Sequence, residues 1–88
     1  MINLDTQLTW VMEAVVKELR RAYKLYPDWP ADPVTAAAIV VEEAGELIQS
    51  ALDVHWHGLT GEDANMIDEA IQTAAMAVRF VMEHTKNG

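Results

Sequence analysis

The chain contains no cysteine, no long apolar run and few basic residues. Without cysteine, disulfides and thiolate metal sites are excluded, and the redox compartment stays open. No apolar stretch approaches the roughly 18 residues from which a membrane-spanning helix is recognised. The first nine residues do not show the basic and apolar regions of a signal peptide. We therefore expect a cytoplasmic protein that has no membrane partner.

The shortage of basic residues is uneven along the chain. Six Lys and Arg stand against 14 Asp and Glu, which gives a net charge of −8. This charge argues against nucleic acid as a partner, because the phosphate backbone would be repelled. From Leu25 to Val78 there are ten acidic residues and no Lys or Arg. A segment with this balance either faces bulk water or binds a cation from outside.

The 88 residues are enough for a single small domain, residues 1–88. The hydrophobic fraction of 51% is high for a chain that must also cover its own surface. A domain of this size buries only a modest share of its surface when it is alone. The surplus of apolar residues therefore predicts self-association as a homodimer or tetramer.

Apolar residues recur at helical spacing in three segments, which predicts an all-α protein. Asp5 or Thr6 would cap a first helix that ends near Leu25, and a proline-rich loop follows. Asp32 and Pro33 fit the cap and first residue of a second helix. The second helix is expected over 33–54 and the third over 60–85, with Thr60 as the cap. We expect three antiparallel helices that complete a four-helix-bundle core by dimerisation.

The stretch 40–53 of the second predicted helix carries the densest acidic charge. At about 100° per residue, Glu42, Glu43 and Glu46 share one arc, and like charges four residues apart destabilise a helix by about 0.2–0.5 kcal/mol. One interpretation is a solvated face, with an apolar opposite arc in the core; the other is a ligand site. Gly45 in this stretch predicts close approach of another helix or a ligand. The opposite arc consists of Val34, Ala37, Val41, Ala44, Ile48, Ala51 and Leu52.

A short connection makes the second and third helices antiparallel, so that their middles can face each other. The three glutamates would then lie opposite Glu69 and Gln72 of the third helix. Mg²⁺ prefers oxygen ligands and commonly takes one or two carboxylates, substrate phosphates and water. A di-iron bundle would require Glu-x-x-His pairs, and the sequence contains none.

The pattern Glu42-Glu43-x-x-Glu46 followed by Glu69-x-x-Gln72 resembles the E-E-x-x-E…E-x-x-D signature of MazG-like all-α nucleoside triphosphate pyrophosphohydrolases. The resemblance covers residues 33–82. It implies Mg²⁺-dependent hydrolysis of (deoxy)nucleoside triphosphates to monophosphate and pyrophosphate by dimers or tetramers. The four glutamates would bind the metal or position water. Gln72 stands where the family commonly has aspartate, and its amide oxygen can ligate a metal without adding charge.

Further residues have expected roles in that reaction. Glu43 or Glu46 is expected to act as the general base, and Mn²⁺ could replace Mg²⁺. The alternative is a non-catalytic helical dimer that binds nucleotide or a protein partner, with its metal site weakened at Gln72. A variant of the enzyme hypothesis has phosphoribosyl-ATP as the substrate. Candidates for substrate binding are the cations Arg79, Lys17 and Arg21, which could meet the outer phosphates, and the aromatic residues Trp29 and Trp56, which could stack on a base.

Overall fold

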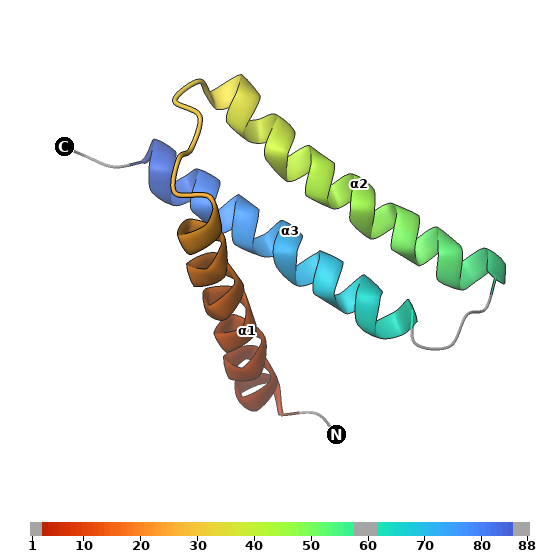
Figure 1. Cartoon of the computed structure of the whole chain (residues 1–88). Helices are drawn as coiled ribbons and strands as arrows, with labels where there is room; N and C mark the ends of the chain where they lie inside the picture. Colours follow the sequence, from red (N-terminus) through yellow and green to blue (C-terminus); the bar gives the residue numbers. More distant parts are fainter. Residues whose placement is uncertain (1–2, 58–61, 86–88) are drawn as a thin grey trace.

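The computed structural model describes residues 3–57 and 62–85. These residues form three α-helices and no strand: α1 (Leu4–Leu25), α2 (Pro33–His57) and α3 (Glu62–His84) (Figure 1). The predicted all-α class is thereby confirmed. The predicted cap Thr60 lies outside the described residues. None of the described helices is long and apolar enough to cross a membrane.

The first two helices begin at side chains that accept hydrogen bonds from the first turn. Asn3 Oδ1 accepts from the backbone N–H of Thr6 at 3.1 Å, so α1 begins two to three residues earlier than predicted. Asp32 Oδ2 accepts from the backbone N–H of Thr35 at 3.1 Å and from its hydroxyl at 2.7 Å. The predicted cap of α2 is therefore confirmed. These bonds hold the pKa of Asp32 below its usual range.

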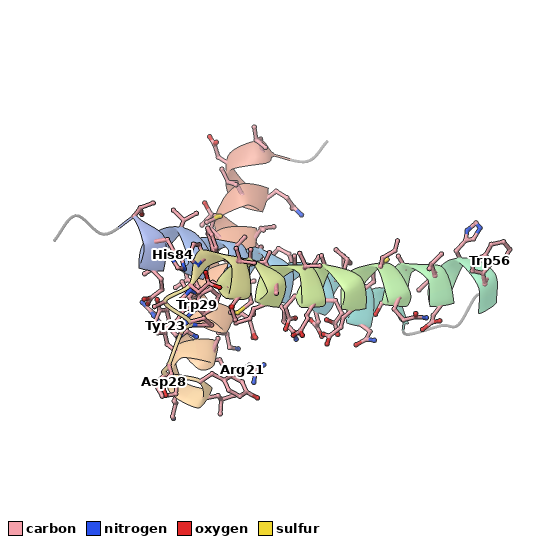
Figure 2. The ribbon with its side chains drawn as sticks, turned by 90° about the horizontal axis from the view of Figure 1, so that it is seen from above. Arg21, Tyr23, Asp28, Trp29, Trp56 and His84 are labelled. Atoms are coloured by element: carbon pink, nitrogen blue, oxygen red, sulfur yellow. The ribbon has the colours of Figure 1, made fainter. Side chains whose placement is uncertain are left out.

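The helices α2 and α3 lie side by side as an antiparallel hairpin, as predicted (Figure 1). The helix α1 is different: within the described ranges its backbone approaches α3 but not α2, and it crosses α3 at a steep angle (Figures 1 and 2). We expected all three helices to be antiparallel; in the described residues this holds for α2 and α3, whereas α1 crosses α3. The crossing follows from packing, because Val15 and Ala22 of α1 are buried against Ala75 and Met76 of α3.

The exposure of the two faces of α2 differs from the solvated-face interpretation, which places the acidic arc in water and the apolar arc in the core. Ala36 and Ser50 are buried, and Glu43 between them is half-buried toward α3. The opposite, apolar face is exposed: Val34 is 76% and Val41 68% accessible. The acidic arc is thus partly inside and the apolar arc outside. This arrangement brings carboxylates to the interface between two helices.

The glycine in this stretch is not in contact with another helix. A Cβ placed on Gly45 would have no described neighbour within 4 Å. The expected close approach of another helix is therefore not found among the described residues, whereas the approach of a ligand stays a prediction. Gly45 lies on the same exposed face of α2 as Val41.

Candidate functional site

Three carboxylates from two helices converge at the middle of the α2–α3 hairpin. Glu43 and Glu46 are three residues apart on α2, and Glu69 comes from α3. One oxygen atom from each carboxylate lies within 4.8 Å of the other two. The antiparallel pairing produces this meeting, because it places the middle of α3 beside the middle of α2. We call Glu43, Glu46 and Glu69 the acidic trio.

The acidic trio is electrostatically unfavourable by itself. Burial, followed by repulsion from Glu46 and Glu69, raises the pKa of Glu43. Burial raises the pKa of Glu69, and hydrogen bonding and repulsion from Glu46 raise it further. Glu43 Oε2 and Glu69 Oε2 are buried, and neither has a hydrogen-bond partner in the described part of the chain. Two buried oxygens without donors fit a hard divalent cation, which binds such oxygens and compensates their charge.

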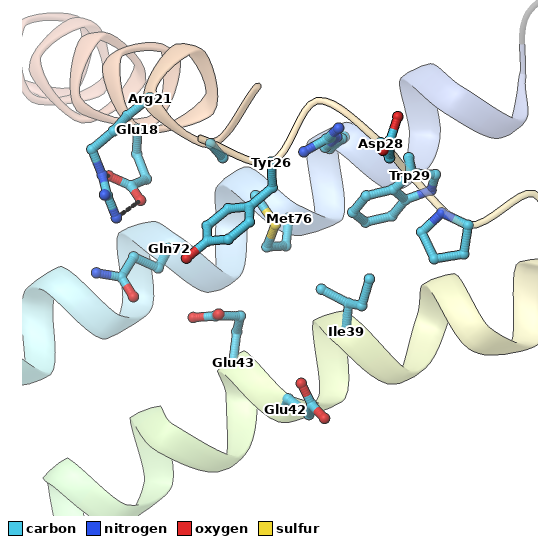
Figure 3. Close-up of a pocket in the computed structure, with 13 residues that line it drawn as sticks. Glu18, Arg21, Tyr26, Asp28, Trp29, Ile39, Glu42, Glu43, Gln72 and Met76 are labelled. Atoms are coloured by element: carbon cyan, nitrogen blue, oxygen red, sulfur yellow. Dashed lines mark hydrogen bonds and ion pairs between the residues drawn. The ribbon is translucent and has the colours of Figure 1, made fainter. Parts of the chain in front are cut away.

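The other two predicted metal ligands, Glu42 and Gln72, do not belong to the acidic trio. Glu42 is exposed on α2, whereas Gln72 is half-buried on α3. Both side chains line a pocket that Glu43 also lines (Figure 3). The structure thus brings three of the five predicted ligands together and places the remaining two in the lining of the pocket that Glu43 also lines.

The pocket lies where all three helices and the loop after α1 meet (Figure 3). Its volume is about 650 Å³, which is within the range of small-molecule sites. Glu42, Glu43 and Gln72 line one part, and Trp29, Ile39 and Met76 line another (Figure 3). The pocket therefore offers oxygen ligands next to an apolar, aromatic surface.

A paired cation lies on the α1 side of the pocket. Arg21 donates from Nε to Glu18 Oε2 and from Nη2 to Glu18 Oε1, both at 3.0 Å (Figure 3). This pair raises the pKa of Arg21. Arg21 was expected to meet phosphates, and the structure does place it in the pocket lining. Glu18 was missed, although its spacing of three residues from Arg21 is typical of a helical ion pair.

A second cation, Arg79, lines the pocket as a buried residue. Only 1% of it is exposed, and its guanidinium carbon lies 4.0 Å from the ring centroid of Tyr23 and 4.9 Å from that of Trp29. Its Nη2 donates to the backbone carbonyl of Pro27 at 3.3 Å. The Nε of Arg79 is buried and has no hydrogen-bond partner among the described residues. Arg79 therefore holds the loop after α1 in place through the carbonyl of Pro27 and the ring of Trp29.

The predicted aromatic residues have different positions. Trp29 lines the pocket, and its Nε1 donates to His84 Nε2 at 3.0 Å. Trp56 is 71% exposed near the far end of α2, away from Arg21 and Trp29 (Figure 2). The second helix was expected to end at residue 54, before Trp56, but α2 continues to His57 and includes it. Nothing in the sequence indicated that Trp56 would lie far from the pocket.

Lys17 lies outside the pocket, on a shallow surface of α1 shared with Val16 and Arg20. Arg21, Trp29 and Arg79 are therefore the predicted substrate-binding residues that the pocket brings together. Tyr26, which was not predicted, also lines it and is 69% exposed. Comparisons with protein-family models, with curated proteins and with solved structures gave no match.

Proposed function

We propose that this protein is a Mg²⁺-dependent nucleotide pyrophosphohydrolase that converts (deoxy)nucleoside triphosphates to monophosphate and pyrophosphate. The observation that supports it is the acidic trio, whose oxygens lie within 4.8 Å of one another next to a pocket of about 650 Å³. Mn²⁺ is an alternative ion, because it accepts the same oxygen ligands. The resemblance to MazG-like enzymes points to the same reaction.

In this proposal Glu43, Glu46 and Glu69 hold the metal. When bound, Mg²⁺ would neutralise charge on the phosphate oxygens. Glu43 is the first candidate for the general base, through a carboxylate oxygen that the metal does not engage. It is also the member of the trio that lines the pocket. Glu46 is the second candidate for this role.

Other pocket residues would bind and orient the substrate. The surface of Trp29, Ile39 and Met76 suits a flat nucleobase, which stacks on aromatic and apolar groups. Arg21 could exchange its bond to Glu18 for a bidentate bond to a phosphate. The amide of Gln72 could fix a water molecule or a ligand beside Glu43. These contacts would place the phosphate chain between the apolar surface and the acidic trio.

We also propose that the active form is a homodimer or tetramer. The exposed apolar face of α2 supports this, because a stable monomer rarely leaves a continuous apolar face in water. Two α2–α3 hairpins would then associate through this face of α2, which brings four helices together.

The reaction is tested by measuring pyrophosphate release from a panel of deoxynucleoside and nucleoside triphosphates, with Mg²⁺, with Mn²⁺ and with chelator. We expect release only with metal. Because a ligand that binds the native state stabilises it, millimolar Mg²⁺ should also raise the melting temperature. Glu46→Gln should remove most of that rise, whereas Glu13→Gln, on the surface of α1, should keep it. An equal rise in both variants would contradict the metal assignment.

The second candidate function is nucleotide or protein binding without turnover, and Gln72 favours it because an amide adds no charge at a position where aspartate would. In that case the wild type would bind a nucleotide and release no pyrophosphate. Gln72→Asp would then restore some release. If the enzyme proposal is correct, Gln72→Ala should reduce turnover strongly, while Gln72→Asp should preserve or increase it.

A further inference from the structure

The exposed face of α2 has the residue spacing of a coiled-coil seam. Six residues on this face are separated alternately by four and by three positions along the helix, as the a and d positions of a heptad repeat are. All six are exposed, and the four largest are 42–76% accessible. The face lies opposite the side of α2 that carries buried Ala36 and Ser50. We call the six residues the outer seam: Val34, Ala38, Val41, Gly45, Ile48 and Leu52.

We propose that the outer seam binds the outer seam of a second copy of this chain, antiparallel, about a two-fold axis at the level of Glu43. In this register Val34 faces Leu52 of the second copy, Ala38 faces Ile48, and Val41 faces Gly45. The pairing is reciprocal, as a two-fold interface requires. It extends over the whole length of the seam.

The sizes of the six residues favour this orientation. Antiparallel pairing places Gly45 against Val41 and Ala38 against Ile48, so that a small residue meets a larger one. Parallel pairing would place Gly45 against Gly45 and Ala38 against Ala38, which leaves voids that packed interfaces avoid. Space at Gly45 is available, since a Cβ there would have no described neighbour within 4 Å.

The flanks of the seam are compatible with a second copy. One flank consists of small residues, Ala37, Ala44 and Ala51, which allow two helices to approach closely. The other flank consists of Thr35, Glu42 and Gln49, and the axis would bring the two Glu42 side chains near each other. Salt screens the repulsion between exposed charges. Dimerisation should therefore strengthen as the salt concentration rises.

The proposal does not rest on catalysis, because no member of the acidic trio belongs to the outer seam. The oligomeric state can be measured by sedimentation equilibrium at micromolar concentration, where the wild type should be a dimer or a multiple of it. Val41→Glu should give a monomer with unchanged helix content, since Val41 is 68% exposed in the single chain. Leu8→Glu is the matched control, because Leu8 is 53% exposed on α1. A monomeric wild type, or a Val41→Glu variant that still dimerises, would overturn the proposal.

The orientation can be tested by cross-linking, because the chain has no native cysteine. In the antiparallel register, two Val34→Cys chains place their cysteines at opposite ends of the seam, about 27 Å apart at 1.5 Å per residue. Val34→Cys alone should therefore give no disulfide dimer. A mixture of Val34→Cys and Leu52→Cys chains should give one, because a disulfide forms between neighbouring residues. Efficient cross-linking of Val34→Cys to itself would overturn the antiparallel register.

Gly45→Leu tests the proposed contact at the centre of the seam. In the single chain this side chain would enter open space, so the helix content should not fall. In the dimer it would collide with Val41 of the second copy. We expect the dissociation constant of the dimer to rise about tenfold or more, as for overpacked contacts. An unchanged or lower dissociation constant would overturn the register.

Discussion

A helix on the surface of a globular protein usually buries its apolar face and exposes its charged face. In α2, a carboxylate lies on the inner face and apolar residues are exposed on the outer face. The inner face, toward α3, has buried Ala36 and Ser50 and the half-buried carboxylate of Glu43. The outer face has Val34 and Val41, which are 76% and 68% exposed. Apolar residues lie on both faces, because Ile39 and Val40 on the inner side pack against the core, so polarity alone did not decide which face is buried. The comparison teaches that α2 is placed by its contacts with α3 and that its outer apolar face stays exposed in the single chain.

The inner face explains why the acidic trio is tolerated. Small residues there, with Ala36 and Ala75 both fully buried, allow α2 and α3 to approach closely. Ser50 accepts a hydrogen bond from Asn65 of α3 at 3.5 Å. Glu43 and Glu69 are then brought into the interface at a cost in desolvation and repulsion. A bound cation would offset that cost, which is why the inner face is expected to respond to metal and the outer face is not.

The largest expected difference between the faces is catalytic. Glu43→Gln on the inner face should reduce turnover about 100-fold or more, because it removes a general base and a metal-binding charge. Measurement of pyrophosphate release at saturating substrate checks this. Glu13→Gln, an exposed substitution of the same kind on α1, is the control and should stay near the wild-type rate. Equal rates in the two variants would remove Glu43 from the mechanism.

Two alanines on α2 sharpen the comparison through stability. Ala36 is fully buried and Ala38 is exposed, although they are only two residues apart. Ala36→Leu should lower the free energy of unfolding by about 1–3 kcal/mol through overpacking. Ala38→Leu should change it by less than about 0.5 kcal/mol. Urea unfolding of both variants in the monomeric Val41→Glu background separates folding from dimerisation, and equal losses would contradict the assignment of the two faces.

The inner face should also make stability depend on pH. The pKa values of Glu43 and Glu69 in the folded chain lie above the ordinary 4.5, so above that pH the folded state retains protons that the unfolded state has released. The contribution of these groups to the free energy of unfolding therefore falls as the pH rises from 4.5 through the raised pKa values.

This dependence is isolated by measuring the free energy of urea unfolding of the wild type and of Glu43→Gln, in chelator, at several pH values from 4.5 to neutrality. The value of the variant is then subtracted from that of the wild type at each pH. The free energy of unfolding of the wild type should fall relative to that of the variant as the pH rises. Millimolar Mg²⁺ should reverse this fall near neutral pH, because the metal binds the ionised carboxylates. A difference that moves in the opposite direction would show that the glutamates are stabilised in the metal-free chain.

The smallest expected effect concerns Gly45 on the outer face. In the monomeric Val41→Glu background, Gly45→Ala should raise the free energy of unfolding by about 0.5–1 kcal/mol, because alanine favours the helix and meets no neighbour. Thermal unfolding measures this gain. A loss would reveal a close contact within the chain and would break the comparison between the two faces.

Much of the secondary structure could be predicted from the sequence. Asp32 and Pro33 defined the start of α2, and apolar spacing defined three helices to within a few residues. The spacing of Glu43, Glu46 and Glu69 predicted carboxylates that could meet across an antiparallel hairpin, and their oxygens do meet. These features are local, or depend on a single short connection, so periodicity and capping are sufficient to predict them.

Other features could not be predicted because they depend on contacts between distant segments. Arg79 was expected to face phosphates, yet it is buried against Tyr23 and Trp29, which are 56 and 50 residues earlier in the chain. Trp56 was a candidate for stacking on a base, but it lies away from the pocket because α2 extends to His57 (Figure 2). A hydrophobic pattern identifies the faces of a helix, but it does not say which neighbour each face meets.

The sequence by itself determined that the chain is helical, where its helices lie, and that α2 has one acidic and one apolar side. The tertiary structure decided which of these sides meets α3, that α1 crosses α3 instead of joining the hairpin, and which cations line the pocket. The physical reason is the range of the interactions. Helix formation depends on residues within about one turn, whereas the choice of a buried face depends on the fit between side chains that are far apart in the chain.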